Sequence, residues 1–331
     1  MLSVVVPAHN EALGIAHAVD VMLQALTSCG MNLELIVVDD GSRDETFERV
    51  RDLSQKDARI KGLRFTRNFG KEAALLAGLR VAIGNAVVTI DSDLQHPPAL
   101  IPQMIDAWRT GAMVVDAVKR SREKDGAFAR VRAGLFNSFL SRLGGINLQN
   151  SSDFKLLDRI VVDAITRGLP EKQRFYRGLA DWVGYSHTSI PFDVGARAVG
   201  QGKWTLWKLI DLATTATVSF TSAPLRIVTI LGLLTLVFGF LVAAEALVGW
   251  SQGRAVSGFT TTIITLLIVG SCIMISLGII GEYIAKIYDE IKARPTYLVE
   301  SAAGFGDEDV AGWRPVTRAQ SADEFASRLP R

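Results

Sequence analysis

The sequence has 331 residues, a formal net charge of +2 and a hydrophobic content of 49%. A charge this close to zero excludes the strongly basic surface typical of nucleic-acid-binding proteins. The two cysteines, Cys29 and Cys272, lie far apart and match no metal-ligand spacing, so we exclude a disulfide scaffold and expect a reducing compartment.

Short apolar runs alternate with helix-like segments in the first third of the chain. The runs predict buried strands at residues 2–6, 35–38, 63–66, 87–90 and 113–117. Helices are predicted between them at residues 11–29, 44–56, 71–83 and 98–109. This alternation is typical of an α/β domain with a mostly parallel sheet, whose ligands bind beyond the carboxyl ends of the strands.

Two long apolar segments follow at residues 227–248 and 260–280. Each has the ~20 residues that a helix needs to cross a bilayer. Basic residues flank the pair, whereas the connecting loop carries one cation, Arg254, so the positive-inside rule places both outer flanks in the cytoplasm. A buried hairpin of a soluble protein is the alternative, and the charge asymmetry disfavours it. No secretory signal follows Met1, so we expect the N-terminal domain to stay in the cytoplasm.

The chain is therefore predicted to have four regions. Residues 1–200 would form a cytoplasmic α/β domain, and residues 201–224 an amphipathic helix at the membrane interface. An ordinary surface helix is the alternative for this second region. Residues 225–283 would form a transmembrane hairpin, and residues 284–331 a cytoplasmic helix with a flexible tail, loosely ordered from Ser301.

An acidic motif directly follows the fourth predicted strand, and it reads Asp91-Ser92-Asp93-Leu94-Gln95-His96-Pro97-Pro98. Carboxylates two residues apart can turn to the same side of an extended chain. Mg²⁺ and Mn²⁺ prefer such oxygen ligands and complete their shell with substrate phosphates. The alternative is an acidic turn before a helix that begins at the two prolines. His96 could be a ligand, but in such a turn we interpret it as structural.

A second acidic pair, Asp39-Asp40, ends the second predicted strand. Ser42 and Asp44 follow it and are interpreted as caps of the next helix. Asp39 comes after four apolar residues and would need a polar partner, such as the amide edge of a nucleobase.

Basic residues recur after the fifth predicted strand and again before the apolar segments. They are Lys119, Arg120, Arg122, Lys124, Arg130, Arg132, Arg174, Arg177, Arg197 and Lys203. Guanidinium groups bind phosphate oxygens well, although each residue could also be a solvated surface charge. Their position between an acidic motif and membrane segments favours phosphate binding.

Together these motifs resemble the family 2 glycosyltransferases of the GT-A fold, and specifically the polyprenyl-phosphate sugar transferases. The closest subgroup looks like the two-span bacterial bactoprenol glucosyltransferases, and the chain also resembles dolichyl-phosphate mannose synthase-like proteins. The resemblance covers nearly all of residues 2–299 and is carried by residues 4–11, 37–42, 67–71, 91–98 and 152–159, and by Arg197, Gly200 and Lys203. Gly202-Lys203-Trp204 departs from the Ser-Lys-Tyr of many relatives, so the role of that loop is open.

The resemblance implies a donor site with a divalent metal ion, Mg²⁺ or Mn²⁺. Residues expected to contact the nucleotide-sugar are Pro7, Ala8, Asn10, Glu11, Ser92, Arg197 and Lys203, the last two at the pyrophosphate. Asp39 or Asp40 would read the base. Asp91 and Asp93 would bind the metal with help from Gln95.

The resemblance also implies where the acceptor is held. Lys119, Arg120 and Arg132 would bind its phosphate, and Asp153 would lie near the reacting centre. A phosphate monoester has a second pKa near ~6, so it is largely dianionic at neutral pH and needs positioning more than a strong base. We therefore expect Asp153 to orient the acceptor or the sugar rather than to act as an essential base, with Asp93, Asp153 and Arg132 as the catalytic residues.

The implied reaction is an inverting, metal-dependent transfer of glucose from UDP-glucose to undecaprenyl or another polyprenyl phosphate. It would take place at the cytoplasmic face of the inner membrane, on a multi-pass homo-oligomeric protein with both termini in the cytoplasm. Mannose, an N-acetylhexosamine or an aminoarabinose derivative are alternative sugars. A metal-dependent nucleotidyltransferase is a further alternative, which the absence of a glycine-rich loop after the first strand disfavours.

Overall fold

The computed structural model describes residues 1–27, 29–119, 152–169, 176–192, 223–253, 258–292 and 294–306. These residues divide into two units, one drawn from Met1–Trp204 and Pro295–Arg331 and the other from Thr205–Arg294. The predicted division at residue 200 stays a prediction, because it falls outside the described residues.

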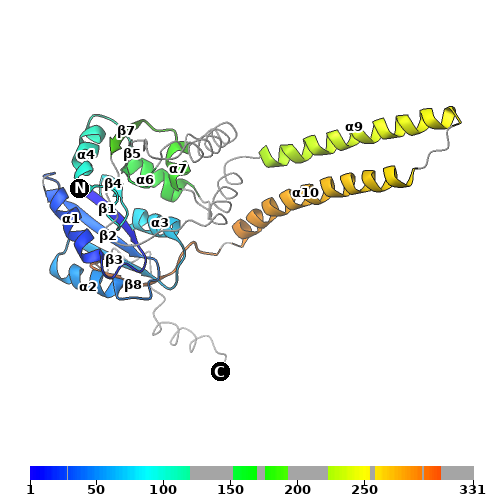
Figure 1. The fold of residues 1–331 in the computed structure, drawn as a ribbon. Coiled ribbons are helices and arrows are strands. Elements are labelled where there is room, and N and C mark those ends of the chain that lie inside the picture. Colours follow the sequence, from blue (N-terminus) through cyan, green and yellow to red (C-terminus); the bar gives the residue numbers. More distant parts are fainter. Residues whose placement is uncertain are drawn as a thin grey trace, which may run out of the picture. The chain divides into compact units, whose positions relative to one another are not determined.

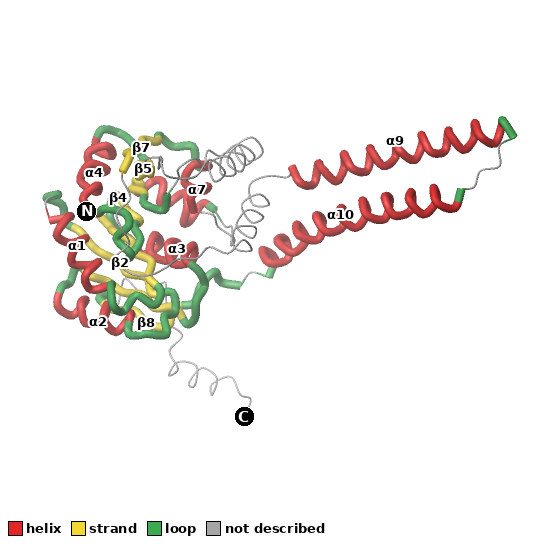
Figure 2. Tube along the Cα trace, viewed as in Figure 1, coloured by secondary structure: helices red, strands yellow, loops and turns green. Residues whose placement is uncertain are grey.

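The first unit is built on a mixed sheet whose described strands run in the order β7-β5-β6-β4-β1-β2-β3-β8 (Figures 1 and 2). The strands are β1 (Leu2–Ala8), β2 (Leu33–Asp39), β3 (Ile60–Phe65), β4 (Ala86–Thr89), β5 (Val114–Lys119), β6 (Lys155–Asp158), β7 (His187–Phe192) and β8 (Val299–Ala303). Strands β1 to β4 are parallel to one another, and β5 is parallel to β7. Strand β6 runs antiparallel between β4 and β5, and β8 runs antiparallel to β3. The predicted α/β fold with a mostly parallel sheet is confirmed.

Helices cover both faces of this sheet (Figure 1). They are α1 (Ile15–Thr27), α2 (Thr46–Lys56), α3 (Lys71–Val81), α4 (Ile101–Arg109), α6 (Arg159–Asp163) and α7 (Tyr176–Trp182), with short turns η1 (Pro98–Leu100) and η2 (Ala164–Gly168). Val4 and Val6 of β1 belong to the core shared with α1 and α4, whereas Val5 belongs to the core shared with α3. Because both faces are buried, the central strands are continuous apolar runs, which is why the sequence predicted them well.

Helix α3 lies unusually close to β1. A Cβ atom at Gly78 would be 2.2 Å from Cγ1 of Val5, so a glycine is needed for this contact. The close packing fixes the first residue of α3, Lys71, near the carboxyl end of β1.

Strand β8 differs from the expectation that the chain is loosely ordered from Ser301. Its residues pair with β3, and the tyrosine ring of Tyr297 stacks on Phe65 with centroids 5.0 Å apart. The carbonyl of Leu298 also accepts a hydrogen bond from the N–H of Thr66 (3.0 Å). The first unit therefore includes chain from both sides of the apolar segments. Residues 307–331 lie outside the described residues.

The second unit consists of two long helices, α9 (Ala223–Ser251) and α10 (Phe259–Ile291), which pack along each other (Figure 1). Within them, Leu225–Gly249 and Thr262–Ile291 are long and apolar enough to cross a membrane, with mean hydropathies of 2.6 and 2.7. Their side chains are not buried within the protein. Both predicted apolar segments fall in these helices. The predicted interfacial helix at residues 201–224 lies almost entirely outside the described residues.

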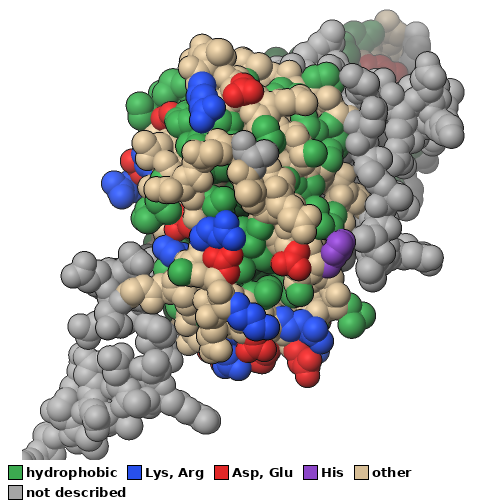
Figure 3. All heavy atoms as spheres, turned by 90° about the vertical axis from the view of Figure 1, so that its left-hand side faces the viewer, with side chains coloured by type: hydrophobic (Ala, Val, Ile, Leu, Met, Phe, Trp, Pro, Cys, Tyr) green, Lys and Arg blue, Asp and Glu red, His purple; other side chains and the backbone are tan. Residues whose placement is uncertain are grey.

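Charged side chains on the first unit are mixed in sign. On the face shown in Figure 3, acidic and basic groups lie close to one another among hydrophobic and uncharged groups. This agrees with the near-neutral net charge of +2.

Candidate active site

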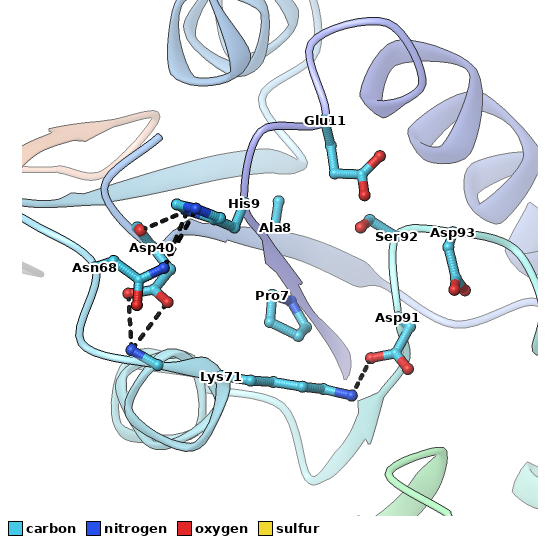
Figure 4. A pocket seen from close by; sticks show the side chains of 11 residues that line it. Pro7, Ala8, His9, Glu11, Asp40, Asn68, Lys71, Asp91, Ser92 and Asp93 are labelled. Atoms are coloured by element: carbon cyan, nitrogen blue, oxygen red, sulfur yellow. Dashed lines mark hydrogen bonds and ion pairs between the residues drawn. The ribbon is translucent and has the colours of Figure 1, made fainter. Parts of the chain in front are cut away.

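A pocket of about 370 Å³ opens where β1, β2 and β4 end. The carboxyl ends of these parallel strands lie together because Ala8 pairs with Asp39 and Val5 with Thr89. The residues that line the pocket are Pro7, Ala8, His9, Glu11, Asp40, Asn68, Gly70, Lys71, Asp91, Ser92 and Asp93 (Figure 4). Four segments that are separate in sequence are therefore brought to one place, as expected for this type of sheet.

The loop after β1 is fixed to the loop after β2 by hydrogen bonds. The N–H of Asn10 donates to the hydroxyl of Ser42 (2.8 Å), and the N–H of Glu11 donates to that of Thr46 (2.9 Å). The side-chain oxygen of Asn10 accepts from the N–H of Arg43 (2.9 Å), and Asn10 has a positive φ of 56°. Asn10 thus joins the two loops and is not among the residues that line the pocket, whereas the Glu11 side chain is.

Asp39 is completely buried at the end of β2. One oxygen accepts hydrogen bonds from the N–H (3.1 Å) and the hydroxyl of Ser42, and the other lies 3.8 Å from Nε of Arg64. Burial raises the pKa of Asp39 above its usual value, although Ser42 and Arg64 partly oppose this. Asp39 orders the turn behind the pocket and does not line it.

Asp40 holds the neighbouring loop that carries Asn68. Its carboxylate accepts hydrogen bonds from the N–H groups of Phe69 (2.7 Å) and Gly70 (2.9 Å). Burial raises the pKa of Asp40, and these two hydrogen bonds oppose the rise. Of the two acids proposed to read a base, only Asp40 lines the pocket, and its oxygens already accept bonds from the protein.

Three potential metal ligands lie close together, and two of them, Asp91 and Asp93, line the pocket. The ligand atoms of Asp91, Asp93 and His96 all lie within 4.8 Å of one another, and Oδ2 of Asp91 is 3.6 Å from Nδ1 of His96. The two carboxylates are oxygen ligands of the kind that Mn²⁺ and Mg²⁺ prefer, and the imidazole adds a possible nitrogen ligand. Gln95, predicted to assist, contributes its backbone N–H as a donor to Asp93 (3.1 Å).

His96 was interpreted from sequence as a structural residue. Its surroundings are compatible with a structural role and with a role as a metal ligand. Its ring is buried between Phe154 and Phe192, with centroid distances of 5.6 and 5.5 Å. At the same time one ring nitrogen faces Asp91. The packing of two phenyl rings that are distant in sequence could not be anticipated from the motif alone.

Lys71 connects two of the predicted acidic residues. Its ammonium nitrogen lies 2.5 Å from Oδ1 of Asp91 and 2.6 Å from Oδ2 of Asp153 (Figure 4 shows the first pair). Burial alone would lower the pKa of Lys71, but the two carboxylates outweigh it and raise the pKa above its usual value. Lys71 belongs to one of the family motifs in the sequence, but no role was predicted for it. The available signal was a lysine at the start of a predicted helix, where the helix dipole disfavours a cation.

Asp153 is 6% exposed and lies just before β6. Its carbonyl accepts a hydrogen bond from the hydroxyl of Thr89 (2.5 Å), which in turn is 2.9 Å from the hydroxyl of Tyr176. Burial raises the pKa of Tyr176, so this group stays neutral. The ion pair with Lys71 fixes the position of the Asp153 carboxylate, and the predicted positioning role of Asp153 stays a prediction.

A second charged cluster lies on the outer strands. The buried ammonium of Lys155 pairs with Asp116, and Nδ1 of His187 is 3.2 Å from Asp116 and 3.7 Å from Asp181. The hydrogen bond to Asp116 raises the pKa of His187, while burial raises the pKa of Asp181. Because Lys155 already neutralises the charge of Asp116, this cluster is best described as an ion-pair network that joins β5, β6 and β7.

The predicted phosphate-binding cations cannot be placed in this geometry. Those outside the described residues are Arg120, Arg122, Lys124, Arg130, Arg132, Arg174, Arg197 and Lys203. The backbones of Lys119 and Arg177 belong to β5 and α7, but their side chains are outside the description. Their roles stay predictions.

Comparison with known proteins identifies family models and relatives to which this chain is similar. Residues 3–167, which contain every residue that lines the pocket, match the family model "Glycosyl transferase family 2", and residues 223–287 match "GtrB C-terminal hairpin". The glycosyltransferase sll0501 of Synechocystis sp., which is uncharacterized, is 41% identical over 92% of this chain and 96% of its own length. The bactoprenol glucosyl transferase of Shigella phage SfII is 35% identical over 91% of this chain and 98% of its own. Among solved structures, glucosyl-3-phosphoglycerate synthase of Mycobacterium tuberculosis overlaps 65% of this chain and 74% of its own at 25% identity, with a TM-score of 0.46.

Proposed function

Because the chain belongs to glycosyl transferase family 2, we propose that this glycosyltransferase moves glucose from UDP-glucose to undecaprenyl phosphate or a similar polyprenyl phosphate. The observation that carries the proposal is the cluster of Asp91, Asp93 and the buried His96, of which the two acids line a pocket beyond the strand ends. The choice of sugar and acceptor is supported by the similarity to a bactoprenol glucosyl transferase over nearly the full length of both chains.

Asp91, Asp93 and His96 would hold a divalent cation, since their donor set fits Mg²⁺ or Mn²⁺. Such an ion, when bound, neutralises charge that develops on a departing diphosphate. The N–H of Gln95 keeps the carboxylate of Asp93 oriented, while the ammonium group of Lys71 pairs with that of Asp91.

The nucleoside would lie against Pro7, Ala8 and Glu11, which line the pocket. We assign base recognition to Asp40 rather than to the fully buried Asp39. A carboxylate has about four lone-pair sites, so Asp40 can accept the imide N–H of a uracil in addition to its bonds from Phe69 and Gly70.

The acceptor phosphate would attack the anomeric carbon directly, with inversion, as the nucleoside diphosphate leaves. Asp153 would orient the acceptor or the sugar, since its ion pair with Lys71 fixes the position of its carboxylate. Lys119, Arg120 and Arg132 are assigned to the acceptor phosphate, and Arg197 and Lys203 to the donor pyrophosphate, on family resemblance.

Helices α9 and α10 would anchor the enzyme in the cytoplasmic membrane, where the head group of a polyprenyl phosphate lies. The catalytic unit and both termini are assigned to the cytoplasmic side because the flanks of the apolar segments are basic. A homo-oligomer is proposed on family resemblance alone.

The test is transfer of labelled sugar from a panel of UDP- and GDP-sugars to undecaprenyl phosphate, with and without EDTA. UDP-glucose should give a lipid-soluble product that EDTA abolishes and that Asp93→Asn fails to make. Asp106→Asn, a substitution at an exposed acid of α4, is the matched control and should keep wild-type transfer. Transfer from another donor would replace glucose by that sugar, and EDTA-resistant transfer would rule out the metal role.

A further inference from the structure

Lys71 occupies a position that helix stability does not explain. It is the first residue of α3, directly after Gly70, whose φ is 96°. The N-terminus of a helix carries a partial positive charge, so a cation there is unfavourable and an acidic residue is preferred. The lysine must therefore be accounted for by what its ammonium group contacts.

The two carboxylate oxygens of Asp91 face different partners, Lys71 and His96. Its ammonium is 2.5 Å from Oδ1 of Asp91, while Oδ2 of Asp91 is 3.6 Å from His96 in the candidate metal cluster. The same ammonium is 2.6 Å from Asp153. Asp91 therefore belongs to the candidate metal cluster and also contacts Lys71. Lys71 in turn has Asp153 as a second acidic partner.

We propose that Lys71 is the counter-ion of Asp91 in the metal-free enzyme, and that it yields Asp91 to the divalent cation while staying paired with Asp153. This inference rests on the metal site of the proposed function. A divalent cation and an ammonium group on the same carboxylate repel each other, so Lys71 opposes metal binding. Asp153 makes the exchange feasible, because Lys71 keeps one partner when it leaves Asp91.

Lys71 is a positioning residue under this account. Without metal, it keeps the carboxylates of Asp91 and Asp153 from repelling each other. With metal bound, it holds Asp153 in place for the acceptor or the sugar. Removing the ammonium should therefore strengthen metal binding and weaken catalysis, whereas loss of a merely structural lysine would weaken both.

The test measures Mn²⁺ binding to the full-length protein in detergent, with neither sugar donor nor lipid present. The electron paramagnetic resonance signal of free Mn²⁺ reports how much of the ion remains unbound. Lys71→Met should bind Mn²⁺ about tenfold more tightly than wild type, because a unit positive charge close to the site is gone. Lys71→Arg keeps the charge and should stay near the wild-type affinity. Lys56→Met, at an exposed position at the end of α2, is the matched control and should change nothing.

A second measurement separates charge from damage to the fold. The rise in melting temperature caused by Mn²⁺ should be larger for Lys71→Met than for wild type, while sugar transfer by the variant falls. Mn²⁺ affinity in Lys71→Met that equals or falls below wild type, or equal tightening in Lys71→Arg, would overturn the inference. The inference would also be overturned if Asp93→Asn bound Mn²⁺ with the same affinity as the wild-type protein. Since no sugar or lipid is used, a wrong donor or acceptor assignment would not affect this result.

Discussion

Gly41 offers a direct test of how the pocket walls are held. It lies between Asp40 and Ser42, has a φ of +63°, and an added Cβ would be 2.3 Å from the carbonyl carbon of Arg67. Two costs follow for Gly41→Ala: an unfavourable backbone conformation, and a clash with backbone that has no side-chain freedom to move aside. The clash would displace either the Asp39–Ser42 turn or the segment that carries Asn68 into the pocket.

The two costs can be separated by a control at Gly30. Gly30 has nearly the same φ, +62°, but an added Cβ there meets nothing within 4 Å. Gly30→Ala should therefore lower the free energy of unfolding only by the conformational cost, about 1 kcal/mol. Gly41→Ala should lower the free energy of unfolding by the same conformational cost and by a further ~1–3 kcal/mol for the clash. Since 1 kcal/mol lowers the melting temperature of a unit of this size by about 2–4 °C, the two variants should differ by several degrees.

The assay is thermal unfolding of the full-length protein in detergent, together with donor kinetics. Gly41→Ala should also raise the KM for the nucleotide-sugar at least about tenfold, since a displacement near 1 Å is costly to binding geometry. Gly30→Ala should leave the KM unchanged. If Gly41→Ala melts no lower than Gly30→Ala and keeps its KM, the close approach of the two loops does not shape the donor pocket.

Two further predictions concern stability. The pKa of His187 is raised by Asp116, so this pair stabilises the fold below the unfolded pKa of histidine, and the contribution is lost as pH rises through the folded pKa. His187→Gln should therefore lower the melting temperature more at about pH 5.5 than at about pH 8.5, and an equal loss at both would contradict the assignment. Tyr297→Ala removes the stacking on Phe65 and should cost about 1–2 kcal/mol. Hydrogen exchange of the Thr66 amide, which pairs with the chain next to Tyr297, should then accelerate, and unchanged exchange would show that β8 does not need the stack.

Much of the catalytic unit could be predicted from the sequence because its signals are local. Strands β1, β2 and β4 are buried on both faces and therefore read as short apolar runs. Parallel strands bring their carboxyl ends to one edge of the sheet, so Asp91 and Asp93 could be expected at the same edge as the loop after β1. That β4 is the direct neighbour of β1 comes from the structure. The family assignment also removes the nucleotidyltransferase alternative.

What the sequence did not predict depends on contacts between distant residues. Strand β8 has one large apolar residue, Val299, and it pairs with the edge of β3, a contact that no local pattern predicts. The pairing of Lys71 with Asp153 joins residues more than eighty positions apart, and no local pattern indicates it. The same is true of His96, whose neighbours Phe154 and Phe192 come from other strands and loops.

The most direct test of the central claim is a balance of products with purified enzyme, Mn²⁺ and UDP-glucose labelled in the sugar. If the account is correct, label enters the organic phase only when undecaprenyl phosphate is supplied, and one UDP is released for each glucose that becomes lipid-linked. Release of UDP without a lipid-linked product, or equal labelling without undecaprenyl phosphate, would contradict it.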